Sequence, residues 1–234
     1  MSRKIKAIIF DWGDTLAPAT LDRYFPAQKV KRKFGLKEEA IKQCLEMLEK
    51  ARTPFTPRTI EEEKAVLADF WFSVAKEIKI KNPDLFVEYL LKWAIEDYVP
   101  TLFPGVLKTI RYLAKQKYYL AVLSNGWPKR LLEIKKSKVG KYFKTVLVSS
   151  LIGAEKPEKK VYQIAIKEIG IPAEQILMVD NKDQYLLPAY NLGMKVLYLD
   201  RIDFNPNSEF PRIKEISEVI DYLNDINCKV LPDC

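Results

Sequence analysis

The sequence of 234 residues predicts an α/β protein built on a doubly wound, Rossmann-like parallel sheet. From residue 101 onward, short apolar runs alternate with amphipathic helical patterns, which is the rhythm of strand–helix–strand units. Several of these runs end in a polar side chain, and the first predicted strand ends at Asp11. In open α/β sheets, the carboxyl ends of the strands form the edge at which ligands bind.

The composition narrows the classes of function. The chain is 48% hydrophobic and carries a net charge of +8, but its basic residues are scattered, so we expect no nucleic-acid partner. No apolar run approaches the roughly 20 residues that span a bilayer, and the early first strand leaves no room for a signal peptide. We therefore expect a cytoplasmic protein without membrane contact. The sequence contains no His, so acid–base and metal chemistry must use carboxylates, Lys and Tyr.

The first strand is predicted at residues 7–10, an apolar run rich in residues that favour strands. It stops at Asp11, and Gly13 and Thr15 follow within four residues. A carboxylate at this point either caps the next turn or reaches a ligand at the edge of the sheet. The residues of this stretch alone favour neither interpretation.

Residues 17–99 show helical patterns without an intervening strand. Residues 36–51 carry apolar side chains at the spacing of one helix face. A second helix is predicted to begin after Thr59, with three Glu in its first turn where the helix dipole favours anions. A third is predicted to begin at Pro83. We expect a helical bundle inserted after the first strand.

The remainder of the chain predicts alternating elements of the sheet and its covering helices. Gly170 and Gly193 mark helix ends, and short apolar runs mark strands. The expected strands are 118–123, 145–148, 176–179 and 195–199. Three helices are expected to begin near residues 104, 128 and 158. Two further helices are expected at about 188–192 and 215–223.

Three predicted strands end in Asp11, Ser124 and Asp180, and a loop carries Lys156 just before a helix. Since right-handed crossovers bring the carboxyl ends of parallel strands to one crevice, we expect these side chains to converge. Two carboxylates there suit Mg²⁺. A Lys and a Ser, together with main-chain amides that follow the strand, suit a phosphoryl group.

These stretches resemble the four motifs of the haloacid dehalogenase (HAD) superfamily of hydrolases. The motifs occur in the family's order and at fitting spacing over nearly the whole chain. The resemblance implies a core domain of residues 1–16 and 100–234 and a type-one helical cap domain of residues 17–99. The matching residues are Asp11-Trp12-Gly13-Asp14-Thr15 for motif one, Ser124 for motif two, Lys156 before Pro157 for motif three and Asp180 for motif four.

The resemblance also implies a reaction. Asp11 would attack the phosphate of a small phosphorylated metabolite, giving an aspartyl-phosphate that water hydrolyses. Mg²⁺ would be held by Asp11, the carbonyl of Gly13, and Asp180. The cap would select the substrate, and the protein would act as a monomer or homodimer. The residues expected at the phosphate are Thr15, Ser124, Asn125, Gly126 and Lys156, of which Ser124 and Lys156 would act in catalysis with Asp11.

Two positions depart from the family pattern. Gly13 stands where the family has its general acid–base Asp, a group whose loss commonly costs about 10²- to 10⁴-fold in rate. Tyr185 stands where many relatives have a second acid of motif four. Asp14 and Asp183 are adjacent to these positions and are the candidates to replace the missing groups.

Three alternatives to the phosphatase remain open. The L-2-haloacid dehalogenases also lack the second Asp of motif one, and residues 123–126 resemble their motif two. Phosphonoacetaldehyde hydrolases carry a motif one close to residues 11–15, but no Lys of the predicted cap matches their Schiff-base residue securely. A weak or inactive relative that binds a phosphorylated ligand or a partner is the third.

Overall fold

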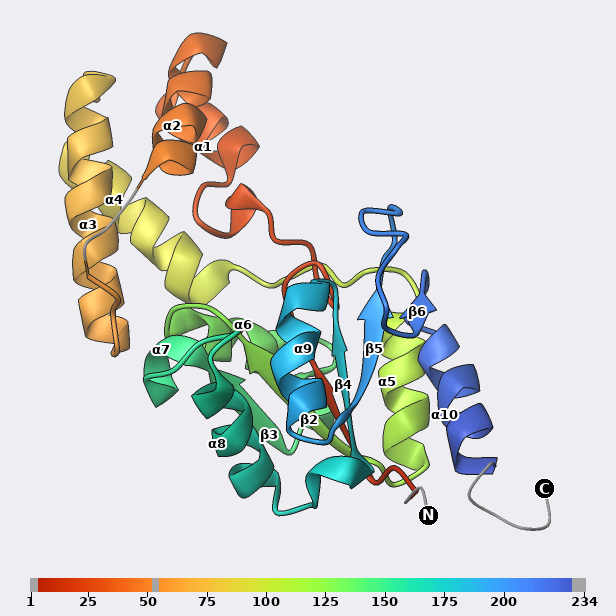
Figure 1. The fold of residues 1–234 in the computed structure, drawn as a ribbon. Coiled ribbons are helices and arrows are strands. Elements are labelled where there is room, and N and C mark those ends of the chain that lie inside the picture. Colours follow the sequence, from red (N-terminus) through yellow and green to blue (C-terminus); the bar gives the residue numbers. More distant parts are fainter. Residues whose placement is uncertain (1–3, 52–54, 229–234) are drawn as a thin grey trace.

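The computed structural model describes residues 4–51 and 55–228 (Figure 1). Residues 1–3 and 229–234 of the predicted core and 52–54 of the predicted cap lie outside the described residues. Six strands form one sheet in the order β3-β2-β1-β4-β5-β6, and each neighbouring pair is parallel. This confirms the predicted fold class. The strands are β1 (Ala7–Phe10), β2 (Tyr119–Ser124), β3 (Thr145–Val148), β4 (Ile176–Asp180), β5 (Lys195–Leu199) and β6 (Arg212–Ile213).

The register of the central strands sets the position of the predicted site. Phe10 at the end of β1 lies between Val122 of β2 and Val179 of β4. Asp11 follows directly, and its main-chain N–H donates to the Val179 carbonyl at 2.9 Å. The three strands therefore end at the same edge of the sheet, with β1 in the middle.

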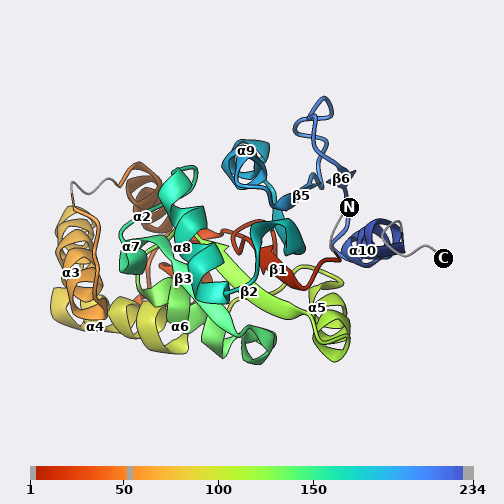
Figure 2. The same ribbon diagram turned by 60° about the horizontal axis from the view of Figure 1, so that its bottom comes forward.

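Side chains of β1 alternate between two hydrophobic layers, as the period of a strand requires. Ile8 and Phe10 pack with α5 (Val106–Lys115), α6 (Lys129–Lys136) and α10 (Glu218–Cys228). Ala7 and Ile9 pack on the other face with α8 (Lys159–Ile169) and α9 (Asp183–Asn191). Figure 2 shows α8 and α9 on one side of the sheet and α5 and α6 on the other. Both faces are covered, which explains the continuous apolar runs of the strands.

The helices between β1 and α5 have a hydrophobic core of their own, in which Phe25 stacks on Trp71 at 5.4 Å between ring centroids. Figure 1 shows these helices beyond the carboxyl ends of the strands. Thr59 and Asn82 cap α3 (Ile60–Glu77) and α4 (Pro83–Lys92) by accepting from main-chain N–H groups three residues on, at 3.1 Å each. The helices are α1 (Ala27–Phe34), α2 (Glu38–Lys50), α3 (Ile60–Glu77) and α4 (Pro83–Lys92), which continues as a π-helix (Trp93–Asp97).

Some elements differ from the prediction. The helix expected at 188–192 begins five residues earlier, because Pro188 lies inside α9 rather than in its first turn. The C-terminal helix begins at Glu218 instead of residue 215, and β6 and the short α7 (Ser149–Ile152) were not predicted. No helix in the described part of the chain has the length and apolar character to cross a membrane.

Candidate active site

Lys156 joins the two carboxylates that the sequence places at neighbouring strand ends. Its Nζ lies 2.6 Å from Asp11 Oδ1 and 2.6 Å from Asp180 Oδ2. All three side chains are buried, with Asp180 and Lys156 at 0% and 1% side-chain exposure. Asp11 and Lys156, which are 145 positions apart in the chain, thus meet at one point with Asp180. The predicted convergence of Asp11, Lys156 and Asp180 is present in the structure.

Asn125 fixes the loop that presents Lys156. Its side-chain amide donates to the Lys156 carbonyl at 2.8 Å, and its Oδ1 accepts from the Lys156 N–H at 2.9 Å. Both polar atoms of this side chain are therefore engaged with the main chain of Lys156. Asn125 as a phosphate ligand through its main chain stays a prediction, and its side chain positions the lysine.

The electrostatics of the site leave one negative charge in excess. Burial opposes the charge on Lys156, but the attraction of Asp11 and Asp180 outweighs it and raises the pKa of the ammonium group. Burial raises the pKa of Asp180 to about 7, assisted by the charge of Asp11 and opposed by Lys156. Two carboxylates sharing one ammonium group thus leave a buried site that a further cation would neutralise.

The residues predicted to bind phosphate lie around this centre. Thr15 is buried and its Oγ1 donates to Asn181 Oδ1 at 3.2 Å. Ser124, 2% exposed, donates to the neighbouring Asn125 carbonyl over a long 3.3 Å. The Gly126 N–H donates to Ser149 Oγ at 3.0 Å. Of these donors, the Ser124 hydroxyl has the weakest internal bond and is the easiest to redirect to a ligand.

Gly13 and Asp14 form the turn after the first strand. An added Cβ at Gly13 would meet only Ala19 Cβ at 3.7 Å, an ordinary contact, and its backbone is outside the left-handed region. Asp14 is exposed, adopts φ 58°, and accepts from the Ala19 N–H through Oδ1 at 2.9 Å. Its carboxylate caps the turn and makes no hydrogen bond to Asp11 or Lys156.

The second position of motif four is occupied by an aromatic ring. The Tyr185 ring lies 5.0 Å from Lys156 Nζ, so it faces the site. The Asp183 carboxylate accepts from the Asn205 side chain and from the Gln184 N–H, the latter at 2.7 Å. Asp183 as a replacement acid stays a prediction.

The carboxylates of Asp11 and Asp180 fit Mg²⁺, because Mg²⁺ commonly uses one or two protein carboxylates and completes its shell with water and phosphate. Asp11 and Asp180 are close enough to share one ammonium group, and their combined charge exceeds that of Lys156. No group of three or more His, Cys, Asp or Glu that could hold a metal occurs among residues 4–51 and 55–228. A bound ion would therefore need ligands beyond side chains.

With this geometry in place, the comparisons with known proteins decide the family. Residues 5–182 match the haloacid dehalogenase-like hydrolases. The chain belongs to this family. It is therefore a hydrolase, and the resemblance drawn from its motifs is confirmed.

Individual relatives divide between two activities of the HAD family. A glyceraldehyde 3-phosphate phosphatase of Pyrococcus furiosus is 27% identical over 210 residues, 84% of this chain and 81% of that protein. A putative HAD-hydrolase of Bacillus subtilis, solved with bound magnesium, has a TM-score of 0.65 at 18% identity over 95% of this chain and 100% of that one. A 2-haloacid dehalogenase of Pseudomonas syringae has the same TM-score and identity over 94% and 99%. The two solved structures show the shared fold.

Arg201, outside the HAD motifs, supports the turn that carries Gly13. Its Nη1 and Nη2 donate to the carbonyls of Asp14 and Thr15, at 2.5 and 2.7 Å. Its guanidinium also lies 4.1 Å from the ring centroid of Phe103. No local sequence pattern predicts this contact, because Arg201 is 186 positions from Thr15.

A buried charged cluster beside the site was also not predicted. Glu133 of α6 accepts from Arg23 at 3.0 and 3.1 Å and from Lys129 at 2.8 Å, and Arg130 lies 3.4 Å away. The Lys129 N–H donates to Glu63 of α3 at 2.7 Å. These contacts join α6 to the helices that precede it in the chain, and one glutamate balances three cations.

Arg130 belongs to the same cluster. Burial and the neighbouring charge of Arg23 lower the pKa of its guanidinium, and the charge of Glu133 opposes this shift. Burial also lowers the pKa of Lys129 to about 7 and raises that of Glu63 to about 7. In the sequence, Lys129 and Glu133 have the i,i+4 spacing of an ordinary exposed helix pair, which conceals their burial.

We expect Glu133→Gln to destabilise the protein by about 3–5 kcal/mol, because it leaves three buried cations facing only Glu63. The free energy of unfolding measured in urea tests this. The matched control is Glu168→Gln, an exposed site on α8, where we expect a change within about 0.5 kcal/mol. Equal stability of the two variants would show that Glu133 does not hold the cluster together.

Proposed function

We propose that this chain is a Mg²⁺-dependent phosphatase that hydrolyses a small phosphorylated metabolite through an aspartyl-phosphate on Asp11. The observation that carries the proposal is the Lys156 ammonium group 2.6 Å from both Asp11 and Asp180 at the carboxyl edge of the sheet. A nucleophilic carboxylate, a fixed cation and a second carboxylate meet there. The phosphatase from Pyrococcus furiosus supports the choice of a small phosphate ester.

In the first step, an Asp11 carboxylate oxygen attacks phosphorus and the bond from phosphorus to the leaving alkoxide breaks. The alkoxide takes a proton from water, since Gly13 has no side chain to supply one. In the second step, water attacks phosphorus of the aspartyl-phosphate. The phosphorus–carboxylate bond then breaks, inorganic phosphate leaves, and the free Asp11 carboxylate is restored.

The polar groups around Asp11 orient its carboxylate and the phosphate in both steps. Lys156 holds the carboxylate of Asp11 in place and reduces the repulsion between that carboxylate and the anionic phosphate. Ser124 exchanges its 3.3 Å bond to the Asn125 carbonyl for a phosphate oxygen. Thr15 and the main chain around Gly126 provide further donors, and the side chain of Asn125 acts on the lysine rather than on the phosphate.

Asp11, Asp180 and the carbonyl of Gly13 would hold Mg²⁺, which supplies positive charge to the phosphoryl oxygens. The excess negative charge of the buried site supports this assignment, as does magnesium in the related Bacillus subtilis structure. We further propose that residues 17–99 form the cap domain that selects substrate over a core of residues 1–16 and 100–234. The protein would act in the cytoplasm.

Removal of metal tests the proposal. We expect EDTA to reduce the release of phosphate from a panel of small phosphate esters to the uncatalysed level, and excess Mg²⁺ to restore it. Phosphate is measured by a colorimetric assay, and thermal unfolding with and without EDTA shows that the fold survives. Release of phosphate that is unchanged by EDTA would contradict a metal-dependent reaction.

A dehalogenase is the second candidate, because Gly13 lacks the acid–base group and a dehalogenase shares the fold. In that reaction Asp11 would displace halide from carbon. The decisive assay is chloride release from 2-chloropropionate without metal. Chloride release in EDTA, together with no phosphate release from any ester, would assign dehalogenation. Tight binding of phosphate esters with neither product would indicate a binding protein.

A further inference from the structure

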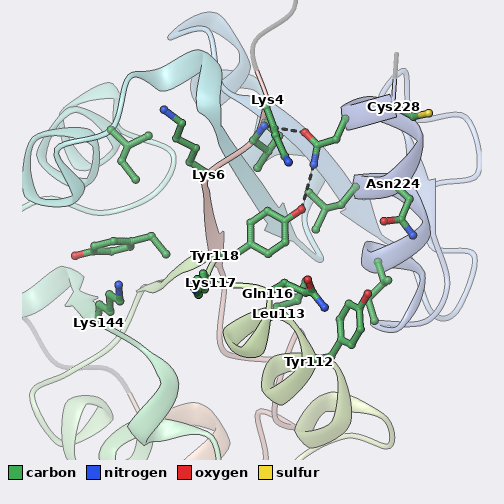
Figure 3. Close-up of a pocket in the computed structure, with 16 residues that line it drawn as sticks. Lys4, Lys6, Tyr112, Leu113, Gln116, Lys117, Tyr118, Lys144, Asn224 and Cys228 are labelled. Atoms are coloured by element: carbon green, nitrogen blue, oxygen red, sulfur yellow. Dashed lines mark hydrogen bonds between the residues drawn. The ribbon is translucent and has the colours of Figure 1, made fainter. Parts of the chain in front are cut away.

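A large pocket lies at the end of the sheet opposite the catalytic site. It has a volume of about 730 Å³ and is lined by the residues that begin the parallel strands and by α5 and α10 (Figure 3). Lys6 precedes β1 by one residue, whereas Asp11 follows it. Five residues of extended chain correspond to roughly 16 Å, so the pocket is separate from the site of Asp11 and Lys156.

The charge of this pocket has one sign. Among the described residues, its lining contains Lys4, Lys6, Lys117 and Lys144 and no Asp or Glu, although the whole chain has 31 acidic residues for 39 basic ones. In the described part of the chain, none of these four ammonium groups is paired with a carboxylate. Lysines that line one pocket without acidic partners create a positive potential, which favours a ligand with more than one negative charge.

The floor of the pocket is polar and ordered. Asn227 is buried, accepts from the Ile5 N–H at 2.9 Å and donates to the Tyr118 hydroxyl oxygen at 3.1 Å. Figure 3 shows Lys4 above this hydroxyl, which a dashed line joins to a side chain of α10. Because its oxygen already accepts, the proton of the Tyr118 hydroxyl is available to donate to a bound group. Burial raises the pKa of this phenol, which keeps that proton in place.

Aromatic rings and free amides complete the lining. Tyr112 is 41% exposed and Tyr119 lies beneath Lys144, whose Nζ is 5.1 Å from the ring centroid. Gln116 and Asn224 are exposed at the rim. Rings stack on the π-face of a planar heterocycle, and side-chain amides bond to its edge. Lys117 adopts a left-handed backbone conformation with φ 64°, where Gly or Asn is usual. A lysine at this position therefore costs some backbone energy.

We propose that this pocket is a nucleotide-binding site, that is, a site for a planar heterocycle that carries at least two negative charges. The lysines bind the phosphates, the Tyr118 hydroxyl donates to one of them, and Tyr112 stacks on the ring. The site does not depend on the chemistry at Asp11, so its test is independent of the proposed phosphatase activity.

The test is calorimetric titration of the full chain at low salt in EDTA, which prevents metal-dependent turnover. The probes are ADP, inorganic pyrophosphate and adenosine. We expect ADP to bind most tightly and pyrophosphate to bind about tenfold more weakly, because it lacks the stacked ring. Added salt should weaken ADP binding. Pyrophosphate or adenosine binding as tightly as ADP would overturn the assignment, as would no binding of ADP.

Variants locate the site. Replacing Lys4, Lys6, Lys117 and Lys144 together by Gln should weaken ADP binding about ten- to thirtyfold. The charge-matched control replaces the exposed Lys64, Lys76, Lys167 and Lys195 by Gln. Its effect should stay below about threefold, since these lysines lie outside the pocket. Equal effects of the two sets would place binding elsewhere, at the active site or over the general surface.

A single substitution separates the ring from the charge. Tyr112→Ala should weaken ADP binding and leave pyrophosphate binding unchanged, because it removes a stacking surface and no charge. As Tyr112 is exposed, the fold does not depend on it. Unchanged ADP binding in this variant would contradict the stacked arrangement.

Discussion

Asp11→Asn is expected to lower kcat for phosphate ester hydrolysis by about 10⁴-fold or more, because an amide cannot form the aspartyl-phosphate. The substitution keeps the shape of the side chain, and Lys156 retains its 2.6 Å bond to Asp180. The fold should therefore persist. Initial rates with p-nitrophenyl phosphate and Mg²⁺ measure the loss, and the thermal unfolding midpoint reports on the fold.

The matched control is Asp14→Asn, three residues away in the same turn. Asp14 uses Oδ1 to accept from the Ala19 N–H, and an Asn side chain can do the same. We expect its rate to stay within about threefold of the wild type if Asp14 takes no part in proton transfer. A loss of about 10²-fold or more would instead assign it the acid–base role that Gly13 cannot fill.

Gly13→Asp is expected to raise kcat by about 10²- to 10⁴-fold, because it supplies the proton donor that the turn lacks. The structure provides room for it, since a Cβ at this position meets only Ala19 Cβ at 3.7 Å. Rates with a series of phosphate esters measure the gain. The gain should be largest for alkyl phosphates, whose poor leaving groups depend most on protonation, and smallest for p-nitrophenyl phosphate.

Gly13→Ala and Gly13→Asn are the controls, because they add a side chain without an acid. Both should remain at the wild-type rate. A folded Gly13→Asp protein whose rate is also unchanged would show that a missing proton donor does not limit this enzyme. The binding-protein alternative would then gain support over the phosphatase.

The sequence predicted best those parts of the site whose positions follow from the sheet. Apolar runs that stop at Asp11 and Asp180 indicate strand ends, and the rules of parallel sheets bring such ends together. Lys156 lies in a loop just before a helix, whose position those rules alone do not give, and its match to motif three of the HAD family supports its inclusion in the site. The role of Asn125 depended on two hydrogen bonds to a main chain 31 residues away, which no local pattern encodes.

The parts that were missed depend on burial rather than on pattern. Glu133 and Lys129 have the spacing of a solvent-exposed pair, yet their side chains are 3% and 0% exposed. Contacts with Arg23, Tyr24 and Glu63, which lie far away in the chain, cover them. The helix predicted at 188–192 is longer than the prediction, since α9 begins at Asp183 and contains Pro188 in its interior.

The two hydrogen bonds from Arg201 limit how far the chain can be shortened without disturbing the active site. Asp11, Ser124, Lys156 and Asp180 all lie within residues 5–182, yet the turn after Asp11 receives two hydrogen bonds from Arg201, which lies beyond that range. A fragment limited to residues 5–182 would keep Asp11, Lys156 and Asp180 but lose these two hydrogen bonds. A design that transfers the active centre to another sheet would therefore have to include β5 and Arg201, which lies two residues after it.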